Sequence, residues 1–276
     1  MQEIQKSKAE QFRKQHVSGK LLILPNIWDA LGARLMETLG FPSVATASVS
    51  VAISNGYTDG ENIPFDKLLE VVRKISLAVQ LPVTVDMERG YADTIPQLKE
   101  NIRLLIENGG IGINIEDSLP DRKGFYSEQE QCKKIEAVKE TGIKYGVPVV
   151  INARTDSFML NKDQDAIGFA ILRAKAYKNA GADCVYPIMM NQYDEISRFI
   201  AEVNMPVNVN LQKPIPDLPR LEQIGVARVS VGPQLLNHVL SNMKQLAEGL
   251  LQYDSSPFFS RDLLSRDYLD SLAYVQ

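Results

Sequence analysis

Short apolar runs alternate with stretches of helical periodicity along almost the whole chain, and this rhythm limits the possible folds more than any other feature. The runs predict strands at residues 21–25, 43–48, 82–87, 112–117 and 147–156, and near residues 184, 207 and 228. Runs that are apolar on both faces are typical of a parallel sheet covered by helices. Eight such strand–helix units close into a barrel, so the sequence predicts an α/β fold with a (β/α)8 TIM barrel.

Recognisable signals start and stop the helices between these strands. Ser127 followed by Glu130 is a capping-box pattern that opens one helix, and Gly109 with Gly110 ends another. Apolar spacing predicts helices over 3–17, 26–39, 65–78, 95–108, 127–145, 164–179, 193–203 and 217–224. The first should cap one end of the barrel. No low-complexity linker divides the chain, so residues 1–276 are expected to form one barrel domain with a helical tail over 257–276.

Charge and cysteine content narrow the classes of partner. The formal net charge is −4 with both signs interspersed, so neither nucleic acid nor a membrane surface is an expected partner. The N-terminal segment lacks the apolar run of a signal peptide or a membrane-spanning helix. Cys132 and Cys184 are not spaced as metal ligands and are consistent with a reducing compartment. A cytoplasmic protein with a small-molecule substrate is therefore expected.

Two acidic residues follow the third predicted strand, in the segment LPVTVDMERGY at 81–91. Side chains alternate along a strand, so Asp86 and Glu88 should share one face while Met87 packs. Carboxylates this close raise each other's pKa unless a cation lies between them, and a hard divalent metal prefers such oxygen ligands. For this pattern alone, the alternative is a strand end that frays into solvated charges.

More charged residues stand at the ends of the next two predicted strands. Glu116 and Asp117 end the fourth, and Arg154 and Asp156 end the fifth. A parallel barrel carries its chemistry at these carboxyl ends, so the side chains should converge. A metal beside a guanidinium can bind a small organic acid, because the arginine takes its carboxylate in a bidentate manner. Such a site would stabilise an enolate oxyanion.

Five segments together resemble the isocitrate lyase and phosphoenolpyruvate mutase superfamily over roughly residues 10–250: LPNIWDALGARL, TASVSVA with GYTDGE, VDMERGY, GINIEDS and INARTD. The resemblance implies a (β/α)8 barrel that binds Mg2+, or Mn2+ in its place. It also implies an α-oxo or α-hydroxy carboxylate substrate. The assembly it implies is a homo-oligomer, a dimer or a tetramer built as a dimer of dimers, with a swapped C-terminal helix.

The same resemblance assigns metal-site roles to individual acids. Asp86 resembles the direct metal ligand, and it should also lie against the substrate. Asp59, Glu88 and Glu116 resemble its neighbours, which hold metal-bound waters, in agreement with the preference of Mg2+ for keeping several waters. Glu116 is also expected to take part in catalysis. The predicted metal site thus consists of four carboxylates.

Substrate contacts are implied by the resemblance as well. Arg154 resembles the residue that binds the substrate carboxylate, and it is counted as catalytic. The backbone around Ala47 and Ser48 resembles the segment that holds the carboxylate end of the substrate. Asn208 is a further residue expected close to the substrate.

The chain departs from the superfamily pattern in the segment SLPDRKGFY, residues 118–126. Isocitrate and methylisocitrate lyases carry a KKCGH or KRCGH gate here, whose cysteine is thought to protonate the enolate; this segment has no cysteine. Mutases carry Lys, Asn and Ser, of which only Lys123 is matched. The segment is predicted to be a mobile lid in which Arg122 and Lys123 hold the far anion of the substrate. Solvated loop charges are the alternative.

These departures leave several functions open. The leading prediction is a Mg2+-dependent carbon–carbon lyase or decarboxylase that acts on a small α-oxo or α-hydroxy carboxylate through an enolate. The alternatives are phosphoenolpyruvate mutase or phosphonopyruvate hydrolase chemistry at a phosphorus–carbon bond, and a non-catalytic ligand-binding barrel. Arg89 stands where the family has a small residue; it either leaves the pocket and packs or pairs on its rim, or provides a second anion contact.

The C-terminal tail is more apolar than a solvated segment needs. Residues 257–276 contain Phe258, Phe259, Leu263, Leu264, Leu269 and Leu272 in two short helical clusters. The tail is therefore predicted to pack on a neighbouring subunit.

Overall fold

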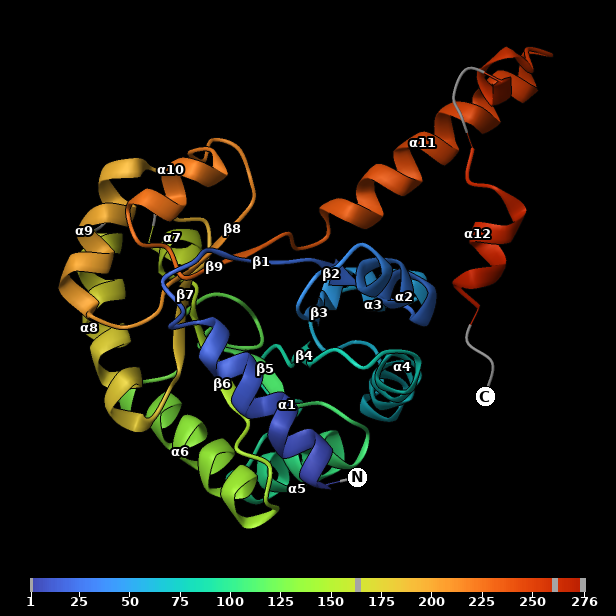
Figure 1. Cartoon of the computed structure of the whole chain (residues 1–276). Coiled ribbons are helices and arrows are strands. Elements are labelled where there is room, and N and C mark those ends of the chain that lie inside the picture. Colours follow the sequence, from blue (N-terminus) through green and yellow to red (C-terminus); the bar gives the residue numbers. More distant parts are fainter. Residues whose placement is uncertain (1, 162–164, 260–262, 274–276) are drawn as a thin grey trace.

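A computed structural model describes residues 2–161, 165–259 and 263–273 of the chain (Figure 1). The strands are β1 Leu22–Leu24, β2 Asn26–Ile27, β3 Val44–Thr46, β4 Val83–Asp86, β5 Gly112–Glu116, β6 Val150–Thr155, β7 Cys184–Pro187, β8 Asn208–Asn210 and β9 Arg228–Ser230. The barrel helices are α2 Ala30–Thr38, α4 Phe65–Ala78, α5 Ile95–Glu107, α6 Glu128–Lys144, α8 Ala166–Ala180, α9 Tyr193–Val203 and α10 Leu218–Gln223.

The strands close into a parallel barrel. Neighbouring strands pair in the order β2-β3-β4-β5-β6-β7 and in the order β1-β9-β8. A parallel bridge between Val185 and Val207 joins β7 to the segment that leads into β8. At the other seam, β1 and β2 are consecutive pieces of one barrel strand, separated by Pro25. These pairings confirm the predicted α/β barrel of eight strands.

The N-terminal helix α1, Gln2–Gln15, covers the end of the barrel where the strands begin. Its Phe12 is fully buried and lies against Gly112, the first residue of β5. The cap expected from sequence is therefore present. The opposite end, where the strands finish, stays open for loops and side chains.

Three helices were not anticipated, and one predicted helix begins later than expected. The additional helices are α3 Ser48–Ser54, α7 Ser157–Leu160 and α11 Gln234–Leu251. The prediction of a helix from residue 26 was wrong, because Asn26–Ile27 is the strand β2, paired with β3. Helix α2 follows Asp29, whose Oδ1 accepts a hydrogen bond of 2.6 Å from the Gly32 N–H. Side-chain capping sets this start rather than apolar spacing.

The strand register brings charged residues together at the carboxyl ends. In the pairing of β5 with β6, Glu116 lies directly beside Arg154. In the pairing of β4 with β5, Asp86 lies beside Asn114. The residue spacing within each strand therefore determines which side chains meet at the open end.

Helix α11 leaves the barrel and projects away from it, followed by the 3-10 helix η1 Ser256–Phe259 and by α12 Arg266–Ser271 (Figure 1). Large apolar side chains stay exposed along this extension, including Leu251 at 81%, Phe259 at 82% and Leu263 at 80%. Residues 260–262 and 274–276 of the predicted tail lie outside the described residues. No helix among the described residues is long and apolar enough to cross a membrane.

The exposed apolar surface of this extension leads to a prediction about assembly. Replacing Leu251, Phe259 and Leu263 together by Ser should shift the protein toward a lower mass in sedimentation velocity, since these side chains would otherwise be buried between subunits. The matched control replaces Ile143 and Leu172 by Ser, which are also exposed but lie on barrel helices. A wild-type protein that already sediments as a monomer would contradict the prediction.

Candidate active site

A cavity of about 220 Å3 lies at the open end of the barrel. Its charged walls come from different segments of the chain: Asp86 ends β4, Arg154 lies in β6, and Asp59 and Arg122 lie in loops. Ala47 and Ser48, at the start of α3, also line it. The structure therefore brings together most of the residues predicted from sequence.

Asp86 is held rigidly at the end of β4. Its N–H donates to Thr46 Oγ1 at 3.0 Å, while its two carboxylate oxygens accept from the N–H groups of Ser48 at 3.3 Å and Glu88 at 3.4 Å. Burial raises the pKa of Asp86, Arg154 opposes this rise, and Asp59 adds to it. A buried carboxylate in this setting favours a cation close by.

The backbone conformation that places Glu88 at the site differs from the one predicted. The expectation that Asp86 and Glu88 share a face of one strand was wrong, because β4 ends at Asp86 and Glu88 has φ +46°. A left-handed turn carries Glu88 back toward the site. Its Oε1 accepts from the Glu61 N–H at 2.8 Å and from the Tyr91 hydroxyl at 3.3 Å, whereas Oε2 is buried without a hydrogen-bond partner among the described residues.

The electrostatic state of Glu88 follows from this placement. Burial is the main reason that its pKa rises to about 8, and the nearby carboxylates of Asp59 and Asp86 raise it further. Without a cation, part of the Glu88 population therefore keeps its proton near neutral pH.

Glu61 stabilises the turn that places Glu88, and sequence reasoning missed this role. Its Oε1 accepts from the N–H groups of Arg89 at 3.0 Å and Tyr91 at 2.7 Å. Non-glycine residues in left-handed backbone are strained, and both Glu88 and Tyr91 have positive φ. The only sequence signal was that Glu61 is the last residue of the GYTDGE motif.

Arg89 leaves the pocket and pairs, as one of the two alternatives predicted, but it lies in the interior rather than on the rim, and it is not free to contact an anion. Its side chain is almost completely buried and pairs with Glu61 Oε2 at 2.9 Å and with Glu116 Oε1 at 3.3 Å. The same left-handed turn explains this, since strand alternation no longer governs where residue 89 points. Arg89 compensates two carboxylates behind the cavity.

Arg154 combines fixed contacts with a guanidinium nitrogen that stays available. Its Nη1 pairs with Glu116 Oε2 at 2.9 Å and its Nε with Asp156 Oδ1 at 2.6 Å. Its Nη2 has only a weak contact with Met159 Sδ at 3.7 Å. Burial acts against the charge, but Glu116 and Asp156 raise the pKa of Arg154 well above its usual value. A cation with a free edge therefore faces the cavity.

Arg122 brings the predicted lid into contact with the acids. Its Nη2 lies 2.9 Å from Asp59 Oδ2 and 4.0 Å from Glu88 Oε2. A bridge between Ser118 and Phe125 closes the segment into a short loop that presents Arg122. Lys123 has an exposed side chain and does not line the cavity, so the structure separates the two basic residues that were predicted to act together.

Asn208 does not line the cavity, contrary to expectation. It is fully buried, and its Oδ1 accepts from the Ser230 hydroxyl at 3.1 Å. Asn210, two residues further along β8, lines the cavity instead, as does Tyr186 of β7. Both lie near strand ends, which is the signal that could have identified them.

The acids fit a hard cation that retains part of its water shell. Asp59 Oδ1 and Glu88 Oε2 are buried acceptors that have no hydrogen-bond partner in the part of the chain that the structure describes. Within residues 2–161, 165–259 and 263–273, no three His, Cys, Asp or Glu side chains form a group that could hold a metal ion by themselves. Oxygen donors that are crowded but do not form a closed cage suit Mg2+, which binds few protein ligands directly.

Fold and cavity together define an α/β-barrel enzyme with acids and arginines at the carboxyl ends of its strands. The chain belongs to the phosphoenolpyruvate phosphomutase family, whose sequence model matches residues 12–251. This confirms the resemblance to the isocitrate lyase and phosphoenolpyruvate mutase superfamily, and with it the prediction of an enzyme.

Individual relatives agree with this assignment. A solved structure from Burkholderia cenocepacia, described as a candidate phosphonomutase, is 36% identical, with a TM-score of 0.84 over 88% of this chain and 99% of that chain. Oxaloacetate decarboxylase of Pseudomonas entomophila is 28% identical over 80% of this chain and 77% of its own length. 2-Methylisocitrate lyase of Bacillus subtilis is 25% identical over 76% and 69%. These named carbon–carbon lyases confirm the predicted class of chemistry.

The raised pKa of Glu88 leads to a prediction about the stability of the metal-free protein. A carboxylate whose folded-state pKa is about 8 destabilises the fold progressively as pH rises from about 4 to about 8. Glu88→Gln removes this titration, so the variant should exceed wild type in free energy of unfolding by about 1–3 kcal/mol at pH 8, and by almost nothing at pH 4.

Urea unfolding followed by circular dichroism in the presence of a chelator measures this difference at several pH values. Glu136→Gln, which replaces an exposed acid on α6, is the control and should follow wild type. Parallel pH profiles for wild type and Glu88→Gln would show that Glu88 carries no such cost.

Proposed function

We propose that this protein is a Mg2+-dependent lyase that breaks a carbon–carbon bond in a small α-oxo dicarboxylate, with oxaloacetate as the leading candidate. The observation that carries the proposal is that Arg154 and Arg122 face one small cavity together with Asp59 and Asp86. Two guanidinium groups suit a substrate with two carboxylates, and the acids between them suit a hard cation.

The acids have distinct tasks in this proposal. Asp86 would be the direct protein ligand of Mg2+, and Asp59, Glu88 and Glu116 would hold its waters. Mn2+ could substitute, since it accepts the same oxygen donors. When bound, the ion supplies Lewis-acid stabilisation of developing negative charge on a substrate oxygen.

Substrate orientation would come from groups of the chain itself. The Nη2 edge of Arg154 would take one substrate carboxylate, while Ala47 and Ser48 border the same end of the cavity. Glu116 keeps the guanidinium in place through its pair with Nη1. Arg122 would release Asp59 and bind the second carboxylate as the loop closes, and Asn210 would lie along the chain of the substrate.

Proton delivery differs from that of lyases with a cysteine gate. Residues 118–126 contain no cysteine, and Cys132 lies within helix α6. Burial raises the pKa of Tyr186, so its hydroxyl keeps its proton at neutral pH. Tyr186 lines the cavity, and its hydroxyl is our candidate for the donor that returns a proton to the enolate carbon.

Phosphorus–carbon chemistry is the second candidate, favoured by the 36% identity to a candidate phosphonomutase. One assay distinguishes the two candidate functions. Purified protein with Mg2+ is offered oxaloacetate, 2-methylisocitrate, an acylpyruvate and phosphonopyruvate, and formation of pyruvate, phosphoenolpyruvate and inorganic phosphate is followed. Turnover of oxaloacetate supports the lyase, and turnover of phosphonopyruvate alone replaces it by the alternative. No turnover despite Mg2+-dependent binding of oxalate would point to the non-catalytic barrel.

Assembly and compartment are also proposals. The exposed apolar surface of α11 and of the described part of the tail supports a homo-oligomer, a dimer or a tetramer, in which a swapped helix covers a neighbour. Cys132 and Cys184 are free thiols, which supports a reducing cytoplasm. We treat residues 1–276 as one functional barrel unit, and neither nucleic acid nor membrane has a role in it.

The metal role of Asp86 has a direct test. Asp86→Ala removes a ligand and its charge together, so both Mg2+ binding and turnover should fall below detection in calorimetry and in the substrate assay. Asp121→Ala, which replaces an exposed acid of the nearby loop, should leave both unchanged. Full activity of chelator-treated wild type would refute a metal-dependent reaction.

The lid arginine and its neighbouring lysine form a matched pair. Arg122→Ala should lower kcat/KM by about tenfold or more, because a charge-assisted contact to the substrate is lost, whereas Lys123→Ala should change it less than about twofold. Mg2+ affinity should not weaken in either variant. Arg122→Ala removes a cation that competes for Asp59, and Lys123 does not line the cavity. Equal effects of the two substitutions would mean that the lid acts through general charge rather than through Arg122.

A further inference from the structure

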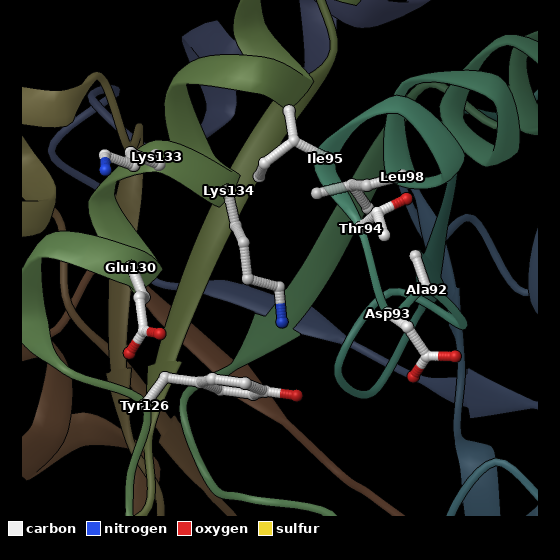
Figure 2. A pocket seen from close by; sticks show the side chains of 9 residues that line it. All are labelled: Ala92, Asp93, Thr94, Ile95, Leu98, Tyr126, Glu130, Lys133 and Lys134. Atoms are coloured by element: carbon white, nitrogen blue, oxygen red, sulfur yellow. The ribbon is translucent and has the colours of Figure 1, made fainter.

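A second cavity, of about 190 Å3, lies outside the active site between the loop that follows β4 and helix α6. Figure 2 shows its two sides: Ala92, Thr94, Ile95 and Leu98 on one, Tyr126 and Lys134 on the other. None of the residues assigned to metal or substrate lines it. It is therefore a separate feature of the molecule.

Lys134 is the unusual component of this cavity. Its side chain is 7% exposed, and its Nζ is buried without a hydrogen-bond partner among the described residues. The ammonium lies 4.2 Å from the centroid of the Tyr126 ring, a cation–π contact that compensates only part of the cost of burying a charge. Burial also lowers the pKa of Lys134 to about 8. The cation is thus desolvated and incompletely satisfied.

The two acids that line this cavity form no ion pair with Lys134 among the described residues, although the carboxylates of Glu61, Glu116 and Asp117 oppose the lowering of its pKa. Glu130 precedes Lys134 by four residues on α6, a spacing that favours an ion pair. However, Glu130 Oε2 accepts instead from Ser127, from its N–H at 2.9 Å and its hydroxyl at 2.6 Å. Asp93 also lines the cavity, but its exposed side chain is screened by solvent and forms no ion pair with Lys134 among the described residues.

The opposite wall favours an anion with an apolar part. Helix α5 begins here, after the N-cap Thr94, so its positive dipole end faces the same space as Lys134. Ile95 and Leu98 add aliphatic surface beside the Tyr126 ring (Figure 2). A cation, a helix N-terminus and an apolar wall together match a carboxylate that carries a short alkyl chain.

We propose that this cavity is a second binding site, for a small aliphatic monocarboxylate whose carboxylate pairs with Lys134 and whose chain lies against Ile95 and Leu98. A free inorganic oxyanion would use the cation but gain nothing from the apolar wall. The proposal does not depend on the lyase function, because it involves none of the residues assigned to that reaction.

The test follows the ring resonances of Tyr126 by NMR while butyrate is added to protein whose tyrosines are labelled with 13C. Tyr126→Phe assigns the signal. Butyrate should shift it saturably, and Lys134→Met should raise the dissociation constant by about tenfold or more, as expected for a lost charge-assisted contact. Lys139→Met is the matched control, since this lysine is also on α6 but is exposed and does not line the cavity, and it should leave binding unchanged.

Three further arms make the result decisive. Lys134→Arg keeps the cation and should retain binding, which separates loss of charge from misfolding. Affinity should rise from acetate to propionate to butyrate by up to about fourfold for each methylene group that becomes buried. Butyrate should still bind when Mg2+ and oxalate are present. Equal binding by Lys134→Met and Lys139→Met, binding of phosphate in preference to butyrate, or loss of butyrate binding in Arg154→Lys would overturn the proposal.

Discussion

Buried carboxylates crowded at the carboxyl end of the barrel are the constraint on which the rest of the structure depends. Glu88 and Glu116 are buried, Asp86 is partly buried, and each is compensated in a different way. Glu116 has two arginines, Asp86 has backbone N–H groups, and Glu88 keeps one oxygen without a hydrogen-bond partner among the described residues. Negative charge is therefore least compensated beside the cavity, where a metal ion would be most strongly stabilised.

The arginines divide the task of balancing this charge. Arg89 is buried behind the cavity and stabilises the acids, Arg154 is fixed on one side and free on the other, and Arg122 approaches from a loop. Only the last two have an edge that a substrate can reach. The Lys134 cavity shows the opposite imbalance, because there a buried cation has no hydrogen-bond partner among the described residues. Both cavities thus carry a charge that the chain alone does not satisfy.

The barrel was predictable because its signals are local. Strands apolar on both faces, the Ser127–Glu130 capping box and the paired glycines after α5 each depend on a few consecutive residues. The predictions were wrong for short elements, where neighbouring local signals favour different secondary structures. Asn26 follows a strand-like run and precedes a helical one, and its pairing with Ala45 of β3 decided the outcome. The helix α3 was missed because its seven residues also suited a strand and a loop.

For the active site, the sequence by itself determined which strand ends carry charge, since Asp86, Glu116 and Arg154 follow from strand position and parallel register. Only the tertiary structure decided how the residues beyond those ends are arranged. The left-handed turn at Glu88 and the burial of Arg89 depend on contacts with Glu61, a residue distant in sequence. Asn210 rather than Asn208 lines the cavity, and Asn208 is buried against Ser230. Strand alternation predicts side-chain direction only while the backbone stays extended, and at Glu88 the backbone turns into the left-handed region although its hydrogen bonds to β5 continue.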